Sequence, residues 1–453
     1  MAGERFVVLG LAPARSAWFR AVGLWSTSGA LPVEFVKCLS REEVAARLAS
    51  GQRFSALLAD GGLPGVDRDL LATATAAGCA VLVVGDDRIS RDWAGLGAAR
   101  VLGPQLTRDE LAGALEAHGR RVRRGAAPPP ARPEPGSVPR RGEVVAVTGP
   151  GGTGASTAAM ALAQALGDEP SRGPVLLADL RLHAELAMLH DAGDVAPGVQ
   201  ELVEAHRLGA PGPEALRGLV FGVPDRNYLL LLGLRRARHW STVRPRAFEA
   251  ALESLERTFA TVVCDVDCDL EGEEAGGSID VEERNIMARS ACARARAVVV
   301  VGSPTTKGVH ALVRVVDEIL AFGVAPARIL PVVNRAPRSA RARAAIAAAL
   351  GQLLAPAVGR AAPDGGIGAE DALPAPVFLP ERALEEGARD GARLPDDLGG
   401  PLATGVVAVA RRAPGLNAEL MLAGGFEPVR PGSLGAPAEG DGDGTMPRSN
   451  GRR

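Results

Sequence analysis

Lysine is almost absent from this sequence. Of its 51 basic residues, only Lys37 and Lys307 are lysine, and all the others are arginine. The formal net charge is −2, so the chain as a whole has no electrostatic attraction to nucleic acid or to anionic lipid. A site that ordinarily uses lysine must therefore use arginine in this chain or do without the positive charge.

Aromatic residues, cysteines and long apolar runs are also scarce. Aromatics make up 3% of the residues, which argues against stacking platforms for single-stranded nucleic acid. The cysteines are five, an odd number, and the first residues lack a basic region followed by a cleavage site, so we expect a reduced, cytoplasmic protein without an export signal. No apolar run approaches the roughly 18 residues that cross a bilayer. The sequence therefore predicts no transmembrane segment, and membrane contact only through partners.

What is present is ordinary for a soluble globular protein, with 47% hydrophobic and 23% charged residues. The length favours about two or three domains. Over residues 1–118, short apolar runs alternate with stretches of helical spacing, and the segment after Leu106 opens with a capping box formed by Thr107 and Glu110. This alternation predicts an α/β domain with a parallel sheet. The expected strands are Phe6–Leu11, Val33–Lys37, a strand ending at Asp60, Val81–Val84 and a short one around Val101.

A second α/β domain is predicted over residues 143–412. Near-continuous apolar strands such as "AVVVVG" are typical of a parallel sheet with helices on both faces. Residues 119–142 are rich in proline and arginine and predict a solvated linker, and residues 413–453 predict a disordered tail. The expected strands are Glu143–Thr148, Val175–Asp179, Tyr228–Gly233, Thr261–Asp265, Ala297–Val301, Ile329–Asn334 and Val377–Leu379.

The segment "VTGPGGTGAST" has the context of a phosphate-binding loop, because a strand precedes it and an Ala/Leu-rich helix follows it. Its glycines let backbone N–H groups curl around phosphate oxygens, and the helix beginning near Ser156 adds the positive end of its dipole. An ordinary glycine-rich turn is the weaker alternative. The candidate nucleotide-binding residues are Gly149, Gly151, Gly152, Thr153, Gly154, Ala155, Ser156 and Thr157.

The loop lacks a cation. Pro150 and Ala155 stand where lysines are expected. Phosphoryl transfer depends almost wholly on positioning and charge stabilisation, and loss of one stabilising group costs about 10²–10³ in rate. We therefore expect weak or absent binding of ATP or ADP with Mg²⁺ and little or no hydrolysis. An arginine from another loop, Arg181 or the pair Arg235–Arg236, is the alternative source of charge.

With these motifs in view, residues 143–412 resemble the ParA/MinD group of P-loop ATPases, whose loop K-G-G-x-G-K-[ST]-T aligns with Pro150–Thr157. "VLLADLRLH" resembles the switch I strand, with Asp179 in the place of its first aspartate and Arg181 replacing the second acidic residue. "VVCDVD" resembles the switch II strand, with Asp265 in the Walker B-like place. "PVVNR" resembles the adenine-binding strand.

This resemblance implies roles for individual residues. Asp179 and Asp265 become the candidate catalytic carboxylates. Ser156 and Asp265 would hold Mg²⁺, the aspartate through water. Asn334 would read the adenine base through its amide.

Residues 1–118 resemble a receiver domain whose chemistry has been lost. Asp60 takes the place of the phosphoacceptor, but "LGLAPAR" stands where an acidic pair is expected after the first strand. Gly85 replaces the hydroxyl residue after the fourth strand, and Gly103-Pro104 replaces the lysine-proline pair. We interpret Asp60 as an ordinary strand-end residue, with phosphorylation of Asp60 as the alternative.

A degenerate receiver joined to a ParA/MinD-like domain resembles the layout of CpaE-type proteins, including the actinobacterial homologues called septum site-determining proteins, which are associated with Tad pilus-like secretion. The resemblance implies a cytoplasmic spatial regulator or scaffold of cell division or of pilus assembly, recruited to the septum or pole by division or pilus/secretion proteins. A homodimer is one option, and DNA is not an expected partner. The alternatives are an active ParA/MinD-type ATPase that dimerises with ATP, and a phospho-responsive regulator.

Overall fold

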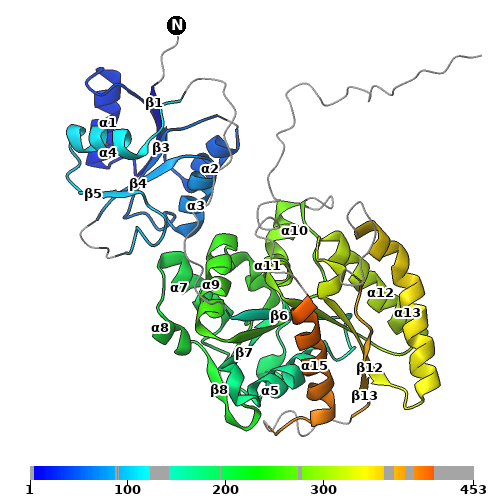
Figure 1. Ribbon diagram of the computed structural model, residues 1–453. Helices are drawn as coiled ribbons and strands as arrows, with labels where there is room; N and C mark the ends of the chain where they lie inside the picture. Colours follow the sequence, from blue (N-terminus) through cyan, green and yellow to red (C-terminus); the bar gives the residue numbers. More distant parts are fainter. Residues whose placement is uncertain are drawn as a thin grey trace, which may run out of the picture. The chain divides into compact units, whose positions relative to one another are not determined.

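The structure is a computed structural model that describes residues 5–412, apart from 51, 87, 88, 90, 123–141, 194, 274–277, 362–371 and 383–391. Residues 1–416 form one compact unit. Most of the predicted linker and all of the predicted tail lie outside the described residues. The described part is an α/β fold with two separate sheets (Figure 1), which confirms the predicted fold class. The division of the chain into domains at the predicted boundaries stays a prediction.

The first sheet has the strand order β2-β1-β3-β4-β5, and every pair of neighbours in it is parallel. This is a doubly wound order, with helices on both faces. Its strands are β1 (Phe6–Leu11), β2 (Val33–Cys38), β3 (Ala56–Asp60), β4 (Ala80–Val84) and β5 (Arg100–Leu102). Its helices are α1 (Ala17–Thr27), α2 (Arg41–Ala49), α3 (Arg68–Ala76) and α4 (Arg108–His118).

Alternation of side chains along the strands builds a core on each side of this sheet. Val8 packs in one cluster with residues of α1 and α4. Val7 and Leu9 pack in the other with residues of α2 and α3. The five predicted strands are present, and Thr107 and Glu110 form the predicted capping box at the start of α4.

The second sheet has the order β13-β12-β11-β6-β10-β7-β9-β8. All its neighbours are parallel except the edge pair of β8 and β9. Its strands are β6 (Glu143–Thr148), β7 (Val175–Leu180), β8 (Phe221–Val223), β9 (Tyr228–Leu231), β10 (Thr261–Val266), β11 (Ala297–Gly302), β12 (Ile329–Ala336) and β13 (Val377–Pro380). Seven of these strands were predicted, and β8 was not.

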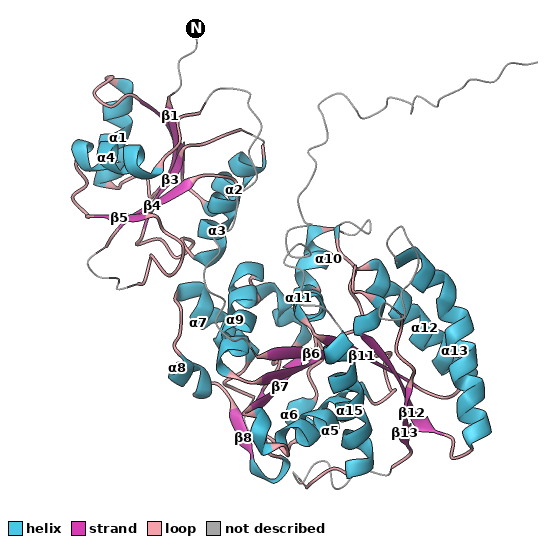
Figure 2. Ribbon diagram, in the orientation of Figure 1, coloured by secondary structure: helices cyan, strands magenta, loops and turns pink. Residues whose placement is uncertain are grey.

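Helices cover both faces of the second sheet (Figure 2). Val145 and Val147 of β6 face a core that includes α5 and α15, whereas Val144 and Ala146 face a core that includes α9, α11 and α12. The helices are α5 (Ala155–Gly167), α6 (Leu186–Leu189), α7 (Val199–Leu208), α8 (Pro213–Arg217), α9 (Pro245–Thr258), α10 (Ile279–Arg284), α11 (Ile286–Arg294), α12 (Thr306–Ala321), α13 (Ala340–Ala361) and α15 (Asp396–Arg412).

The strand order places the phosphate-loop motif at the centre of the sheet. β6 lies between β10 and β11, which follow each other along the chain but lie on opposite sides of it. In open parallel sheets, ligands bind beyond the carboxyl ends of strands at such a switch point. The loop between β6 and α5 is therefore at the position where this fold forms a site.

One helix, α13, is long and apolar enough to cross a membrane by length and composition alone, although the sequence predicted no such segment. Its Leu350, Leu354, Ala357 and Val358 are buried, and Arg360 near its end forms an ion pair with Asp317 of α12 at 2.6 Å. These contacts pack one side of α13 against the fold, while most of the helix is exposed.

Candidate phosphate-binding site

Positive φ angles and neighbouring atoms that leave no room for a Cβ explain why several positions of the loop are glycine. Gly152 and Gly154 have φ angles of 77° and 89°, in the left-handed region that favours glycine. A Cβ at Gly149 would lie 2.2 Å from the Val301 carbonyl oxygen, and one at Gly154 would lie 2.5 Å from Nδ2 of Asn334. Gly151 and Gly152 have no neighbour within 4 Å of a Cβ position, so this side of the loop is open.

The loop presents unused backbone donors. The amide and hydroxyl of Thr153 both turn back onto the Pro150 carbonyl oxygen, at 3.3 and 2.7 Å. By contrast, the amides of Gly152, Gly154 and Ala155 donate no hydrogen bond to any described residue, and α5 has no side-chain cap. Free amides at the positive end of a helix dipole are the elements of an anion site. The loop therefore fits a phosphate group.

The strand β12 supplies two side chains to this loop. Asn334 donates from Nδ2 to the Thr153 carbonyl oxygen at 2.8 Å, and the exposed Arg335 reaches the Gly152 carbonyl oxygen at 3.4 Å. Asn334 therefore holds the loop in place, and its predicted contact with a base stays a prediction. The sequence did not predict this contact of Arg335 with the loop. The one available signal was that Arg335 follows Asn334 directly.

The structure places no cation at the two expected lysine positions. Ala155 is the first residue of α5 and is 5% exposed, and its methyl group joins the apolar core beside the sheet. Pro150 begins the turn. The two lysines of the chain lie elsewhere, Lys37 in β2 and Lys307 in the first turn of α12. Neither lysine therefore stands within the loop itself.

Asp179 and Asp265 lie side by side, because they are register partners on the neighbouring strands β7 and β10. Both are 0% exposed. Asp179 accepts hydrogen bonds from the amides of Arg181 (3.3 Å) and Leu186 (2.9 Å), whereas neither oxygen of Asp265 has a hydrogen-bond partner within the described residues. Burial raises the pKa of Asp179 to about 6, and burial with the adjacent Asp179 raises the pKa of Asp265 to about 7.

Arg181 supplies the positive charge at this edge of the sheet. Its Nη1 lies 3.7 Å from Oδ1 of Asp265, and its Nη2 lies 3.5 Å from Oδ1 of Asp267. Arg235, an alternative source of charge in the sequence, instead forms an ion pair with Glu201. Asp267 was missed as a site residue, although its spacing of two residues from Asp265 at a strand end was a usable signal.

The predicted Mg²⁺ ligands do not form a convincing metal site. The side chain of Ser156 is near enough to lower the pKa of Asp265. However, Asp265 already faces the Arg181 guanidinium, whose Nη1 lies 3.7 Å from its Oδ1. The residues present therefore fit a phosphate but do not fit a divalent cation.

Asp60 ends β3 at the carboxyl edge of the first sheet, as predicted. Its Oδ1 accepts a hydrogen bond from the Gly62 amide at 2.9 Å, and its Oδ2 accepts one from the Trp18 indole at 3.2 Å. Both oxygens are thus satisfied by neutral donors. The geometry is that of a strand-end turn residue.

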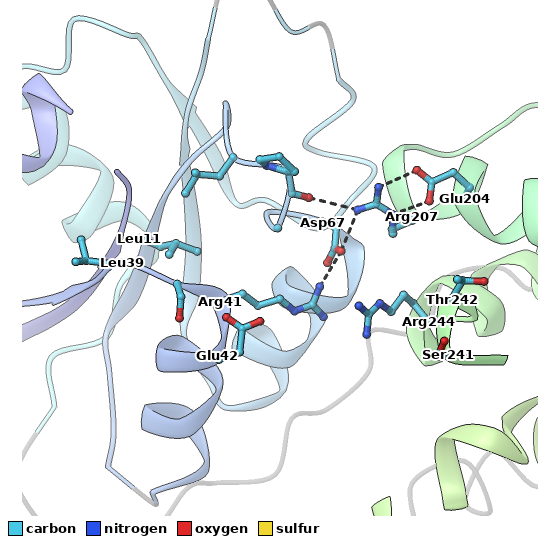
Figure 3. Close-up of a pocket in the computed structure, with 14 residues that line it drawn as sticks. Leu11, Leu39, Arg41, Glu42, Asp67, Glu204, Arg207, Ser241, Thr242 and Arg244 are labelled. Carbon is cyan, nitrogen blue, oxygen red and sulfur yellow. Dashed lines mark hydrogen bonds and ion pairs between the residues drawn. The ribbon is translucent and has the colours of Figure 1, made fainter. Parts of the chain in front are cut away.

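A cleft of about 540 Å³ lies away from the phosphate loop and is lined by none of its residues. Figure 3 shows its central contact, in which Arg41 and Arg207 both point at Asp67. Their Nη1 atoms lie 2.8 and 3.3 Å from Oδ2 of Asp67, whose side chain is 2% exposed, and Arg207 also pairs with Glu204 at 2.7 Å. Arg41 and Arg207 are therefore already paired with carboxylates.

No protein-family model and no curated protein matches the chain. Several solved structures are similar to it, among them proteins described as a ParA family ATPase and a MinD cell division ATPase. A ParA family ATPase from Chlorobium tepidum has 16% identity and a TM-score of 0.43, covering 60% of this chain and 99% of its own. The cell division ATPase MinD of Pyrococcus furiosus has 22% identity and a TM-score of 0.39, covering 60% and 98%. The septum site-determining protein MinD of Pyrococcus horikoshii, complexed with Mg-ADP, has 19% identity and a TM-score of 0.40, covering 62% and 98%.

Proposed function

We propose that this protein is a non-hydrolysing P-loop scaffold that acts as a spatial regulator of cell division or of Tad-pilus-like assembly. One observation carries the biochemical part of the proposal. Free backbone amides surround the phosphate position, while Ala155 is buried where a cation should extend over it. A site of this kind can hold an anion, but it lacks the lysine charge that would follow the phosphoryl group during transfer.

We assign the following roles to the residues of the site. The amides of Gly152, Gly154 and Ala155 and the helix dipole of α5 bind phosphate oxygens. Asn334 fixes the loop through the Thr153 carbonyl oxygen and would contact the base of ATP or ADP. Asp265, the best candidate for a catalytic carboxylate, is buried with a raised pKa and faces Arg181. Nucleotide would therefore act as a bound ligand that sets the conformation of the protein.

The cellular role rests on the ordered motifs of the sequence. The segments that resemble the ParA/MinD loop, both switch strands and the adenine strand belong to one sheet, on β6, β7, β10 and β12, with β11 between β6 and β12. A scaffold of this type would bind division or pilus/secretion proteins in the cytoplasm and be recruited by them to the septum or pole. Homodimerisation is the property to test first, since an active ATPase of this type would dimerise with ATP.

The test uses the purified full-length protein. Binding of ATP and ADP is measured by calorimetry, ATP turnover by phosphate release, and mass by gel filtration with each nucleotide. We expect binding without turnover above that of an Asp265→Ala control. Turnover above this control, together with an ATP-dependent dimer, would establish the active ATPase instead.

A further inference from the structure

A guanidinium pairs with two carboxylates at one edge of the second sheet. Asp265 lies near the carboxyl end of β10 and Asp267 directly follows it, and Arg181 pairs with the two at 3.7 and 3.5 Å. Asp179 takes its hydrogen bonds from backbone amides, so it does not depend on an ion. Asp265 is fully buried, with the Ser156 side chain and the Arg181 guanidinium near its carboxyl group. When it is ionised, a carboxylate buried in this way needs a cation close by.

Backbone contacts hold Arg181 in this position. Its own amide donates to Asp179 at 3.3 Å, and the next amide, that of Leu182, donates to Oδ2 of Asp267 at 2.7 Å. The Arg181 side chain is 19% exposed. Arg181 is therefore anchored from both sides over the carboxylates, unlike the exposed Arg335 on the other side of the loop.

From this geometry we propose that Arg181 is the resident cation of the site and takes the place of a divalent metal ion. The phosphate loop then binds the phosphates of a nucleotide without Mg²⁺, a statement that rests on the nucleotide binding proposed above. A divalent ion placed beside the guanidinium would be repelled at short range, where effective screening is weak. The positive charge that balances Asp265 then belongs to the Arg181 side chain, and it stays in place whether or not a nucleotide is bound.

The first experiment measures Mn²⁺ binding to the full-length protein by electron paramagnetic resonance, without nucleotide. We expect the wild type and an Arg335→Gln control to bind Mn²⁺ equally weakly. Arg181→Gln, which is neutral and similar in shape, and Arg181→Asp should both bind it about 10-fold or more tightly, since a repulsive charge is removed. Arg181→Lys keeps the charge and should behave as the wild type. The proposal would be overturned if Arg181→Gln and Arg181→Asp bound Mn²⁺ with the same affinity as the wild type.

The second experiment measures the thermal shift caused by ADP in EDTA and in Mg²⁺. The wild type should shift equally in both, and Arg181→Gln should shift more in Mg²⁺ than in EDTA. A wild-type shift that requires Mg²⁺ would overturn the role of Arg181 and leave nucleotide binding intact. No shift under either condition would instead remove the proposed nucleotide function, and the Mn²⁺ titration would still decide whether Arg181 excludes the metal.

Discussion

Asp60 and Asp265 occupy matching positions, each near the carboxyl end of a central strand in a parallel sheet, yet their surroundings differ. Asp60 is partly exposed and accepts hydrogen bonds from the Trp18 indole and the Gly62 amide. Asp265 is fully buried, accepts no hydrogen bond within the described residues and faces Arg181. Neutral donors satisfy both oxygens of Asp60, so this carboxylate has no need of a bound cation. Asp265 faces a guanidinium instead, and the anion site that we propose is in the same sheet.

Removing the charge beside Asp265 should have the largest effect. Arg181→Ala leaves a buried carboxylate without its cation, so we expect the free energy of unfolding to fall by about 3 kcal/mol at pH 8. The matched control Arg335→Ala removes an exposed arginine beside the same loop and should change it by about 0.5 kcal/mol or less. Urea denaturation of both variants measures the difference. Equal losses would show that Arg181 is an ordinary surface arginine.

The next largest effect is expected at one of two glycines in the phosphate loop, Gly154, with Gly151 as its control. Gly154→Ala places a methyl group at a φ of 89° and 2.5 Å from Nδ2 of Asn334, which should cost about 2 kcal/mol of stability and abolish ADP binding. Gly151→Ala meets no atom within 4 Å and should leave stability nearly unchanged. Denaturation and calorimetry report both quantities. A Gly154→Ala protein that binds ADP like the wild type would contradict the proposed cradle.

The two buried carboxyls predict an unusual pH dependence. The pKa of Asp265 is raised to about 7 and that of Asp179 to about 6, above the values of an unfolded chain. The folded protein therefore binds more protons than the unfolded one between about pH 4 and pH 7, and stability should fall as the pH rises through this window, by at most about 1.4 kcal/mol per pH unit for each carboxyl. Asp265→Asn should flatten the profile measured by urea denaturation. A wild-type protein whose stability rises over this window would refute the assignment.

The smallest effect is expected at Asp60. Asp60→Asn keeps an oxygen acceptor for the Gly62 amide, so stability should change by about 1 kcal/mol or less. Acetyl phosphate should label neither the wild type nor this variant, as measured by mass spectrometry. Labelling of the wild type that Asp60→Asn removes would support the phospho-responsive alternative.

Local patterns predicted much of the fold. The strand at Phe6–Leu11 and the capping box of Thr107 and Glu110 are found as predicted, because hydrophobic runs and caps act over a few residues. The strand β8 (Phe221–Val223) was missed. It is three residues long, is not buried, and exists through antiparallel pairing with β9 at the sheet edge. Only tertiary structure creates such a strand.

The candidate site was predicted less fully than the fold. The loop glycines and the free helix end follow from the motif, and so does the absence of lysine. The pairing of Asp179 with Asp265 depends on β10 lying next to β7, although about 80 residues separate them along the chain. The ion pairs of Arg181 depend on the turn that follows β7. The sequence could name Arg181 as a source of charge but could not show which group it would contact.

The most direct test of the account is a paired measurement of ADP or ATP binding and ATP hydrolysis on one preparation of the full-length protein. The account predicts saturable binding with phosphate release no faster than that of Asp265→Ala. Sustained release well above that variant would contradict it, since a loop without its lysines would then be supporting phosphoryl transfer.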